Sequence, residues 1–267
     1  MSFKPPRITV SIAQTQTEVK QATEFCGSVY QRNYGTRWTV PPDLFFVAKE
    51  NGEIVATGGL TFAARHTQIA SERYYRLTDG MRDFIAANRE TIVEFGRFAS
   101  VKVLGAKAIM HSTLAYCTRW DFKFLFAWAN PTVSHHTSRL GLNLWPISVS
   151  LDLNNAVNDL RWATPPTGFF MRARPPALHL VVVPFCGNVI RRLAQDCGFA
   201  TATPVLQTPN PAEVHATMKS TSFVHAAPKL IRTEADVGAQ RESGAFPDLK
   251  PPSEPAPELH HEPPHMK

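Results

Sequence analysis

The sequence TIVEFGRFASVKVLGAKAIM, residues 91–110, carries the main evidence for the architecture of this protein. Its first half is typical of a buried strand, and its second half has apolar residues at helical spacing. Two opposite charges, Glu94 and Arg97, interrupt the apolar run of the strand. Because strand side chains alternate between faces, residues three apart should point to opposite sides unless a β-bulge intervenes. An isolated glycine often marks a bulge, so we predict one at Phe95–Gly96 that brings both charges to one cleft.

The neighbouring sequence predicts a sheet with helices between its strands. Residues 44–65 hold two apolar runs on either side of Asn51-Gly52, the pair that favours a tight type I′ hairpin turn. Periodicity predicts further strands at 7–14, 122–130 and 143–153, helices at 15–32, 102–120 and 131–142 (the last opened by Pro131), and a mostly helical stretch at 67–89.

The chain divides by composition into a core, an extension and a tail. We predict a core at residues 1–153, an extension of the same domain at 154–200 and a disordered tail at 201–267. In the extension, GFFMRARPPALHLVVVP predicts one or two strands, and GNVIRRLAQDCGF predicts a helix. The tail is rich in Pro and poor in apolar residues, which is the composition of disorder. Its histidines imply no rigid geometry, so we expect no metal site.

Composition limits the class of protein and its partners. A hydrophobic content of 43%, with 17 Phe and 5 Trp, is ample for a packed core. The net charge of +6 favours an acidic partner or reflects scattered surface charge, and no basic run predicts nucleic-acid binding. The four cysteines fall at no metal-ligand spacing, the N-terminus lacks an apolar signal core, and no apolar run approaches a bilayer span. We therefore expect a soluble, cytoplasmic protein without a transmembrane segment.

The order of elements resembles the GNAT N-acyltransferase fold. That fold is α/β (α+β), with a mostly antiparallel central sheet flanked by helices and one splayed strand pair. In the family, the pantetheine arm of an acyl thioester lies between the splayed strands, and a glycine-bearing loop leads to a helix whose N-terminus receives the pyrophosphate. The loop pattern is Gln or Arg, Gly three residues later, and Gly or Ala two residues further. Lys102 and Gly105 fit this pattern, whereas Lys107 replaces the small residue between Ala106 and Ala108.

A second spacing also resembles GNAT enzymes. Asn130 and Gly141 lie eleven residues apart, as in the family, but Thr137 replaces the Tyr that acts as general acid, and His136 is the adjacent candidate. The resemblance implies that the thioester is bound by Ala99, Val101, Lys102, Gly105, Ala106, Lys107 and Asn130.

Within this superfamily the sequence is similar to the thermostable hemolysin family, which is related to N-acyl amino acid synthases and acyl-homoserine-lactone synthases. Those synthases draw fatty acyl groups from acyl carrier protein. The segments that carry the resemblance are VYQRNYGTRW (29–38), VEFGRFAS (93–100), RLGLNLWPI (139–147) and GFFMRARPPALHLVVV (168–183). Relatives commonly have an uncharged residue in place of Arg97, and Asp43 alone represents the acidic residues that the synthases place after the Trp38 loop.

The resemblance implies roles for several residues. Glu94 would orient or deprotonate the incoming amine, and Arg97 would hold a carboxylate or fix the loop around Arg32 and Trp38. The bulge would supply a backbone N–H to the oxyanion. The acyl tunnel would be lined by Phe62, Phe98, Phe124 and Phe126. In the structural alternative, Glu94 forms a buried ion pair with Arg97 or Arg32 that only fixes the loop.

The sequence therefore predicts an N-acyltransferase that uses an acyl-ACP or acyl-CoA thioester and an amine acceptor such as an amino acid. One alternative is an acetyl-CoA-dependent small-molecule N-acetyltransferase. The other is a membrane-active hemolysin-like protein without catalysis. The acyl chain length, the identity of the amine acceptor and the choice between acyl carrier protein and CoA stay open at this point.

Overall fold

The structure is a computed structural model that describes residues 8–171, 174–198 and 206–207. The strands of its main sheet are β1 (Ile8–Ile12), β2 (Leu44–Glu50), β3 (Glu53–Phe62), β5 (Ile92–Ser100), β6 (Phe124–Ala129), β7 (Trp145–Pro146), β9 (Ala177–Val182) and β10 (Leu206–Gln207). A small second sheet pairs β4 (Tyr75–Arg76) with β8 (Ser150–Leu151). The helices are α1 (Gln16–Tyr34), α2 (Ala70–Tyr74), α3 (Asp79–Asn88), α4 (Val103–Arg119), α5 (Pro131–Arg139), α6 (Leu153–Val157), α7 (Thr167–Phe170) and α8 (Gly187–Asp196). Three 3₁₀ turns complete the set: η1 (Ala63–Arg65), η2 (Arg89–Thr91) and η3 (Val183–Cys186).

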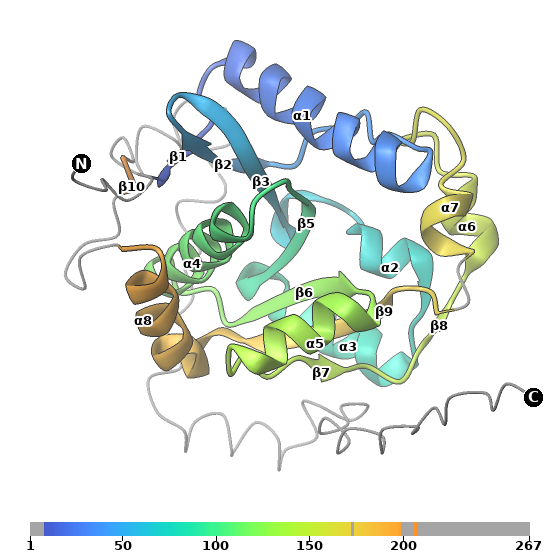
Figure 1. Cartoon of the computed structure of the whole chain (residues 1–267). Helices are drawn as coiled ribbons and strands as arrows, with labels where there is room; N and C mark the ends of the chain where they lie inside the picture. Colours follow the sequence, from blue (N-terminus) through green and yellow to red (C-terminus); the bar gives the residue numbers. More distant parts are fainter. Residues whose placement is uncertain (1–7, 172–173, 199–205, 208–267) are drawn as a thin grey trace, which may run out of the picture.

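The main sheet has the strand order β10-β1-β2-β3-β5-β6-β9-β7. Its β1–β10 and β5–β6 pairs are parallel and its other pairs are antiparallel. Figure 1 shows α1 on one side of the first strands and α4 with α8 on the other. The mixed, mostly antiparallel sheet flanked by helices that the sequence predicted is therefore confirmed.

Local signals explain the first elements. Thr15 Oγ1 accepts a hydrogen bond from the Glu18 N–H (3.2 Å), and the Glu18 carboxylate accepts one from the Thr15 N–H (3.0 Å). This capping box starts α1 at the predicted place. The predicted hairpin is also present: Asn51 and Gly52 have φ of 52° and 87°, and a type I′ turn needs both values positive.

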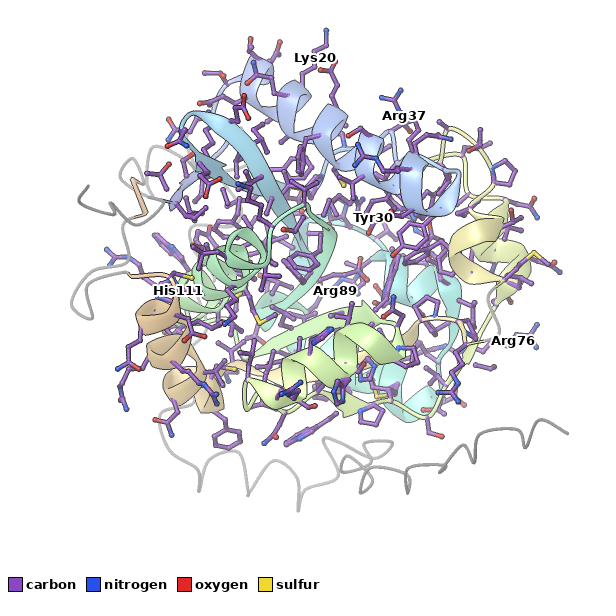
Figure 2. All side chains as sticks on the ribbon, viewed as in Figure 1. Lys20, Tyr30, Arg37, Arg76, Arg89 and His111 are labelled. Carbon is purple, nitrogen blue, oxygen red and sulfur yellow. The ribbon has the colours of Figure 1, made fainter. Side chains whose placement is uncertain are left out.

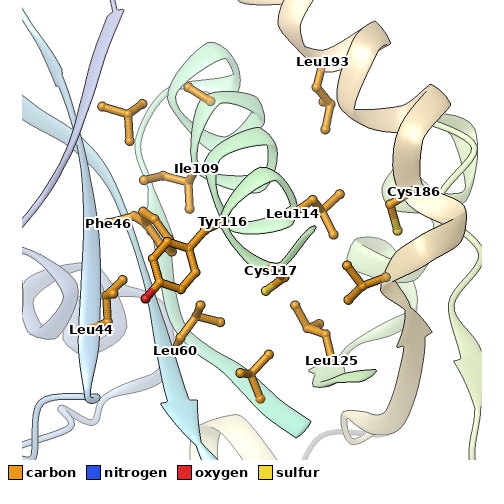
Figure 3. Close-up of a cluster of buried hydrophobic side chains, with 14 of the residues drawn as sticks. Leu44, Phe46, Leu60, Ile109, Leu114, Tyr116, Cys117, Leu125, Cys186 and Leu193 are labelled. Atoms are coloured by element: carbon orange, nitrogen blue, oxygen red, sulfur yellow. The ribbon is translucent and has the colours of Figure 1, made fainter. Parts of the chain in front are cut away.

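The core lies on both faces of the sheet. Along β2, Phe45 and Val47 pack with the α1 side, whereas Leu44 and Phe46 belong to the larger cluster beneath α4. Figure 3 shows this larger cluster, in which side chains from β2, β3, α4, β6 and α8 meet. In Figure 2, Tyr30 points from α1 toward the sheet and Lys20 points outward.

The predicted strand at 143–153 is wrong. That segment forms only β7 and β8, which belong to different sheets. The place beside β6 is taken by β9 from the extension, where Phe124 pairs with Val182 and Ala129 with Ala177. Pro146 has no N–H to donate, so its strand can lie only at the edge of the sheet, and β7 is the edge strand.

The extension thus supplies β9 and α8, and α8 packs on α4. The predicted tail at 201–267 lies outside the described residues except for Leu206–Gln207, which pairs in parallel with β1.

Candidate active site at the divergence of β5 and β6

β5 leaves its neighbour β6 halfway along its length. The two strands pair from Ile92–Phe124 to Phe95–Ala127, and the rest of β5 continues without β6. On its other side, β5 pairs Gly96 with Gly59 and Ala99 with Thr57, so its extra residue lies between them. The bulge is therefore at Arg97–Phe98, not at Phe95–Gly96 as predicted. Arg97 itself adopts the left-handed conformation, with φ of 50°.

A cavity of about 290 Å³ opens where the strands diverge. On the α1 side it is lined by Cys26, Tyr30, Tyr34, Trp38, Trp162 and Phe169. On the α4 side it is lined by Met110, Leu114, Leu125, Leu142 and Val181. Residues 96–100 of β5 and 127–130 at the end of β6 form its walls. The cavity therefore passes through the sheet and is mostly apolar.

Arg97 lies beside this cavity and also lines a second, smaller one. Its guanidinium carbon is 3.9 Å from the centroid of the Trp38 ring. Burial lowers the pKa of Arg97, while the Glu94 carboxylate acts in the opposite direction and the Arg161 guanidinium adds to the lowering. An arginine stays protonated in proteins, so Arg97 brings a positive charge to the site. Its Nε is buried without a hydrogen-bond partner among the described residues.

Glu94 is buried, with an exposed fraction of 2%, and lines the smaller cavity. Its carboxylate accepts hydrogen bonds from the backbone N–H groups of Ala70 (3.1 Å) and Ser71 (2.7 Å) and from the Ser71 hydroxyl. Trp128 Nε1 in turn donates to Ser71 Oγ at 3.0 Å. The bulge places Glu94 and Arg97 on one cavity, and the described ion pairs do not join them.

The smaller cavity has a volume of about 40 Å³. Besides Glu94 and Arg97, its polar lining residues include Asp43, His66 and Arg161. Arg161 is held by Asp159, which accepts from its Nε at 2.9 Å, and by Tyr74 (3.1 Å). Burial raises the pKa of Asp159, but its hydrogen bonds from Arg161 and Tyr74 outweigh this and lower it to about 2. Arg161 therefore keeps a fixed charge next to Arg97.

The residues predicted to bind the thioester fall into two groups. Ala99 and Asn130 line the large cavity, and Asn130 also caps α5 by accepting from the Val133 N–H (2.9 Å). Lys102 and Lys107 lie at the start of α4, where they form ion pairs with Glu50 and, at 2.7 Å, with Asp196.

The other predicted residues at the start of α4 have structural surroundings. Gly105 packs against β3, where a Cβ atom would meet Val55 and Ala56 at 3.1 Å. Ala106 continues the helix by donating to the Lys102 carbonyl (3.0 Å), and Val101 is 51% exposed and lines neither cavity. Thr137 lines the large cavity, but its hydroxyl donates to backbone carbonyls of its own helix.

Several expectations are corrected by the structure. Arg32 is exposed and lines neither cavity, because Cys26, Tyr30 and their helical neighbours turn the other face of α1 to the site. The alternative Glu94–Arg32 pair is therefore also wrong. His136, the candidate in place of the missing Tyr, is exposed and lines neither cavity. Of the four phenylalanines expected in the tunnel, Phe98 lines it, whereas Phe62, Phe124 and Phe126 are in the core.

Sequence reasoning missed Arg161, Trp162 and His66. The local sequence NDLRWATPP has no motif or periodicity, so only the tertiary structure brings Arg161 next to Arg97. One signal was available for Trp162: a second Trp in a polar, Pro-bounded segment is expected to need an aromatic partner. That partner is Trp38, whose ring centroid is 4.3 Å away.

No helix within the described ranges is both long and apolar enough to cross a bilayer. The same ranges hold no cluster of three or more His, Cys, Asp or Glu side chains placed to bind a metal ion.

Solved structures of known proteins resemble this chain in fold. A CoA-dependent acyl-homoserine lactone synthase, BjaI, solved with SAM and isopentyl-CoA, has a TM-score of 0.50 at 12% identity, covering 79% of this chain and 98% of that chain. FeeM, an N-acyl amino acid synthase from uncultured soil microbes, has a TM-score of 0.46 at 16% identity, covering 73% and 99%. The first likeness shows that this chain has the fold of that synthase.

The family follows from the sequence profile. The thermostable hemolysin profile matches residues 12–162, more than half of the chain, and the protein belongs to that family. No curated protein matches the sequence.

Proposed function

We propose that this protein is an N-acyltransferase, which moves a medium or long acyl group from a thioester to the amine of an acceptor that carries a carboxylate. The observation that carries the proposal is the apolar cavity passing through the sheet where β5 leaves β6. A thioester placed there has apolar walls for its acyl chain and strand backbone on both sides.

The donor arm is proposed to lie between the diverging strands. The last residues of β5 extend beyond the β6 pairing, so their backbone on that side is not used by the β5–β6 ladder. The extra residue of a bulge is also left unpaired. An N–H at Arg97–Phe98 can therefore stabilise the oxyanion that forms when an amine attacks the thioester carbonyl.

The acceptor carboxylate is proposed to bind Arg97, because an unpaired charge in a half-buried site is costly. The described ion pairs do not include Arg97. Arg161 lines the same small cavity and adds a second positive charge. Glu94 lines only the small cavity, so it would orient the acceptor ammonium through water held there and not by direct contact. An α-amino acid carries both of the groups that this arrangement complements.

The experiment is to incubate the purified protein with acyl-CoA and, separately, acyl-ACP of two to sixteen carbons, in the presence of pooled amino acids. Thiol release is followed by absorbance, and N-acyl products are identified by mass spectrometry. Burial of a methylene is worth about 0.8 kcal/mol, so the apparent KM should fall about fourfold per methylene until the cavity is full. Glu94→Gln and Arg97→Met should lose product, and His135→Gln, on the exposed face of α5, should not.

The outcomes separate the alternatives. Turnover with acetyl-CoA that does not increase with chain length would instead identify a small-molecule acetyltransferase. Leakage of liposomes by the protein without any thioester would identify direct membrane activity. Thiol release without any amide product would overturn the proposal.

A further inference from the structure

His66 and Asp43 form a hydrogen-bonded pair at the small cavity. His66 Nε2 lies 2.9 Å from Asp43 Oδ2, and both residues line the 40 Å³ cavity together with Glu94 and Arg97. The function proposed above leaves this pair without a role.

Both members of the pair are held in place by the backbone around them. Asp43 Oδ2 also accepts from the Phe62 N–H at 2.8 Å, at the end of β3. His66 directly follows η1: its N–H donates to the Ala63 carbonyl (3.2 Å), and its own carbonyl accepts from Arg89 (2.8 Å). A histidine that donates one ring N–H to a carboxylate keeps the other ring nitrogen as a proton acceptor.

Glu94 is already engaged by hydrogen-bond donors of the protein. Its two carboxylate oxygens accept three hydrogen bonds, from the Ala70 N–H, the Ser71 N–H and the Ser71 hydroxyl. A carboxylate has about four acceptor sites, so one is left for water in the small cavity. A ring nitrogen of His66, on the same cavity, is a further group that can accept a proton from that water.

The size of the cavity indicates how the proton travels. A volume of 40 Å³ is far below the range of about 300–1,000 Å³ that ligand pockets have. It exceeds the roughly 10–15 Å³ that one ordered water requires, and its lining includes polar side chains that can bond water, among them those of Asp43 and His66. The small cavity is thus large enough for water but not for a ligand, and Arg97 lines both it and the large cavity.

On the basis of the proposed function, we propose that His66, oriented by Asp43, accepts the proton that the acceptor ammonium loses, through water in the small cavity. The ammonium gives one proton to His66, and the neutral amine attacks the thioester carbonyl. The new C–N bond forms, the C–S bond breaks, and the departing thiolate takes up the second proton of the amine nitrogen. His66 then releases its proton to solvent, to which 38% of its side chain is exposed.

The charges facing His66 come from several elements. Asp43 and Glu94 are the carboxylates, from the segment before β2 and from β5. Arg65 lies 3.9 Å from Asp43 Oδ1, and Arg89 bonds the His66 carbonyl. Arg97 and Arg161 line the cavity on the remaining sides.

The test measures kcat/KM for amide formation between pH 6 and 10 in wild type, His66→Gln and Asp43→Asn. Gln keeps a donor toward Asp43 but cannot take up the proton. We expect His66→Gln to lose about 10²–10⁴-fold at neutral pH, the usual contribution of a positioned base. The loss should shrink as the pH approaches 10, because the acceptor amine then loses its proton in solution. Asp43→Asn should give a smaller loss with the same pH dependence, and His135→Gln should match wild type throughout.

The results that would overturn the role of His66 differ from those that would overturn the proposed function. A loss in His66→Gln that is equal at every pH shows a structural role and overturns the inference, as does an unchanged profile in both variants. Thermal unfolding of each variant identifies one that does not fold, in which case the pH profile of the other decides. If wild type forms no amide at any pH, the proposed function fails, and the role of His66 fails with it.

Discussion

The guanidinium of Arg97 stacks over Trp38, with 3.9 Å between the guanidinium carbon and the ring centroid. Trp38 in turn meets Trp162 edge to face, and the Arg161 guanidinium carbon lies 5.2 Å from the same Trp38 ring. A cation over an indole contributes about 0.5–2 kcal/mol, depending on how dry the site is. The bulge of β5, the loop before β2 and the segment at 159–162 are therefore joined at one point.

Arg97→Lys tests the acceptor site. Lysine keeps the charge but loses the planar fork that matches a carboxylate. A charge-assisted hydrogen bond is worth about 1.5–3 kcal/mol, so KM for a carboxylate-bearing amine should rise about 10–100-fold. KM for the same amine without its carboxylate should not change, and Arg191→Lys on α8 is the matched control. Equal effects on both acceptors would contradict carboxylate binding by Arg97.

Backbone strain at Arg97 predicts that glycine is more stable than alanine at this position. Its φ of 50° is unfavourable for every residue with a Cβ atom, whereas glycine adopts it without cost. Arg97→Gly should therefore have a free energy of unfolding about 1 kcal/mol higher than that of Arg97→Ala, measured by urea unfolding. At Lys20 in α1, the order should reverse, because alanine favours a helix by about 1 kcal/mol over glycine. The same order at both positions would argue against a left-handed Arg97.

Gly168→Ala should destabilise the wall of the large cavity. A Cβ atom at Gly168 would lie 2.2 Å from the Tyr34 carbonyl oxygen, so α7 would have to move away from α1. Tyr34 and Phe169 both line the large cavity, and their ring centroids are 5.0 Å apart. We expect a loss of about 1–3 kcal/mol, as for other overpacked sites, together with a higher KM for long-chain donors. Gly187→Ala, where nothing lies within 4 Å, should be neutral by both measurements.

His179 predicts how stability depends on pH. Burial lowers the pKa of His179 to about 4. Between pH 6.5 and 4 the unfolded chain therefore binds a proton that the folded state does not. Stability should fall as the pH drops through this window, by up to about 1.4 kcal/mol per pH unit. His179→Gln should flatten this part of the urea-unfolding profile, and an unchanged slope would rule out His179 as its source.

Local signals in the sequence predicted the elements that depend on local chemistry. Asn51-Gly52 located the hairpin, and Thr15 with Glu18 located the start of α1. Glu94 and Arg97 both line the small cavity, and Arg97 also lines the large one. The bulge was misplaced by two residues because Gly96, the obvious candidate, pairs regularly with Gly59.

Features that depend on distant pairing were not predictable in this way. β9 takes its place beside β6 only through pairing over about fifty residues, and periodicity contains no information on that partner. Arg161 and His66 reach the small cavity through turns whose sequences have no distinctive pattern. Their roles follow from the contacts of the folded chain alone.

The position of β9 has a consequence for synthesis of the protein. As the chain leaves the ribosome from its N-terminus, β5 and β6 are complete well before residues 177–182 emerge. Until then, the edge of β6 that pairs with β9 has no neighbouring strand, which is the condition that invites pairing with another nascent chain. A polypeptide that stops at residue 162, where the family match ends, would remain in that condition. Pairing of β9 with β6 thus closes the sheet edge through which the nascent chain could aggregate.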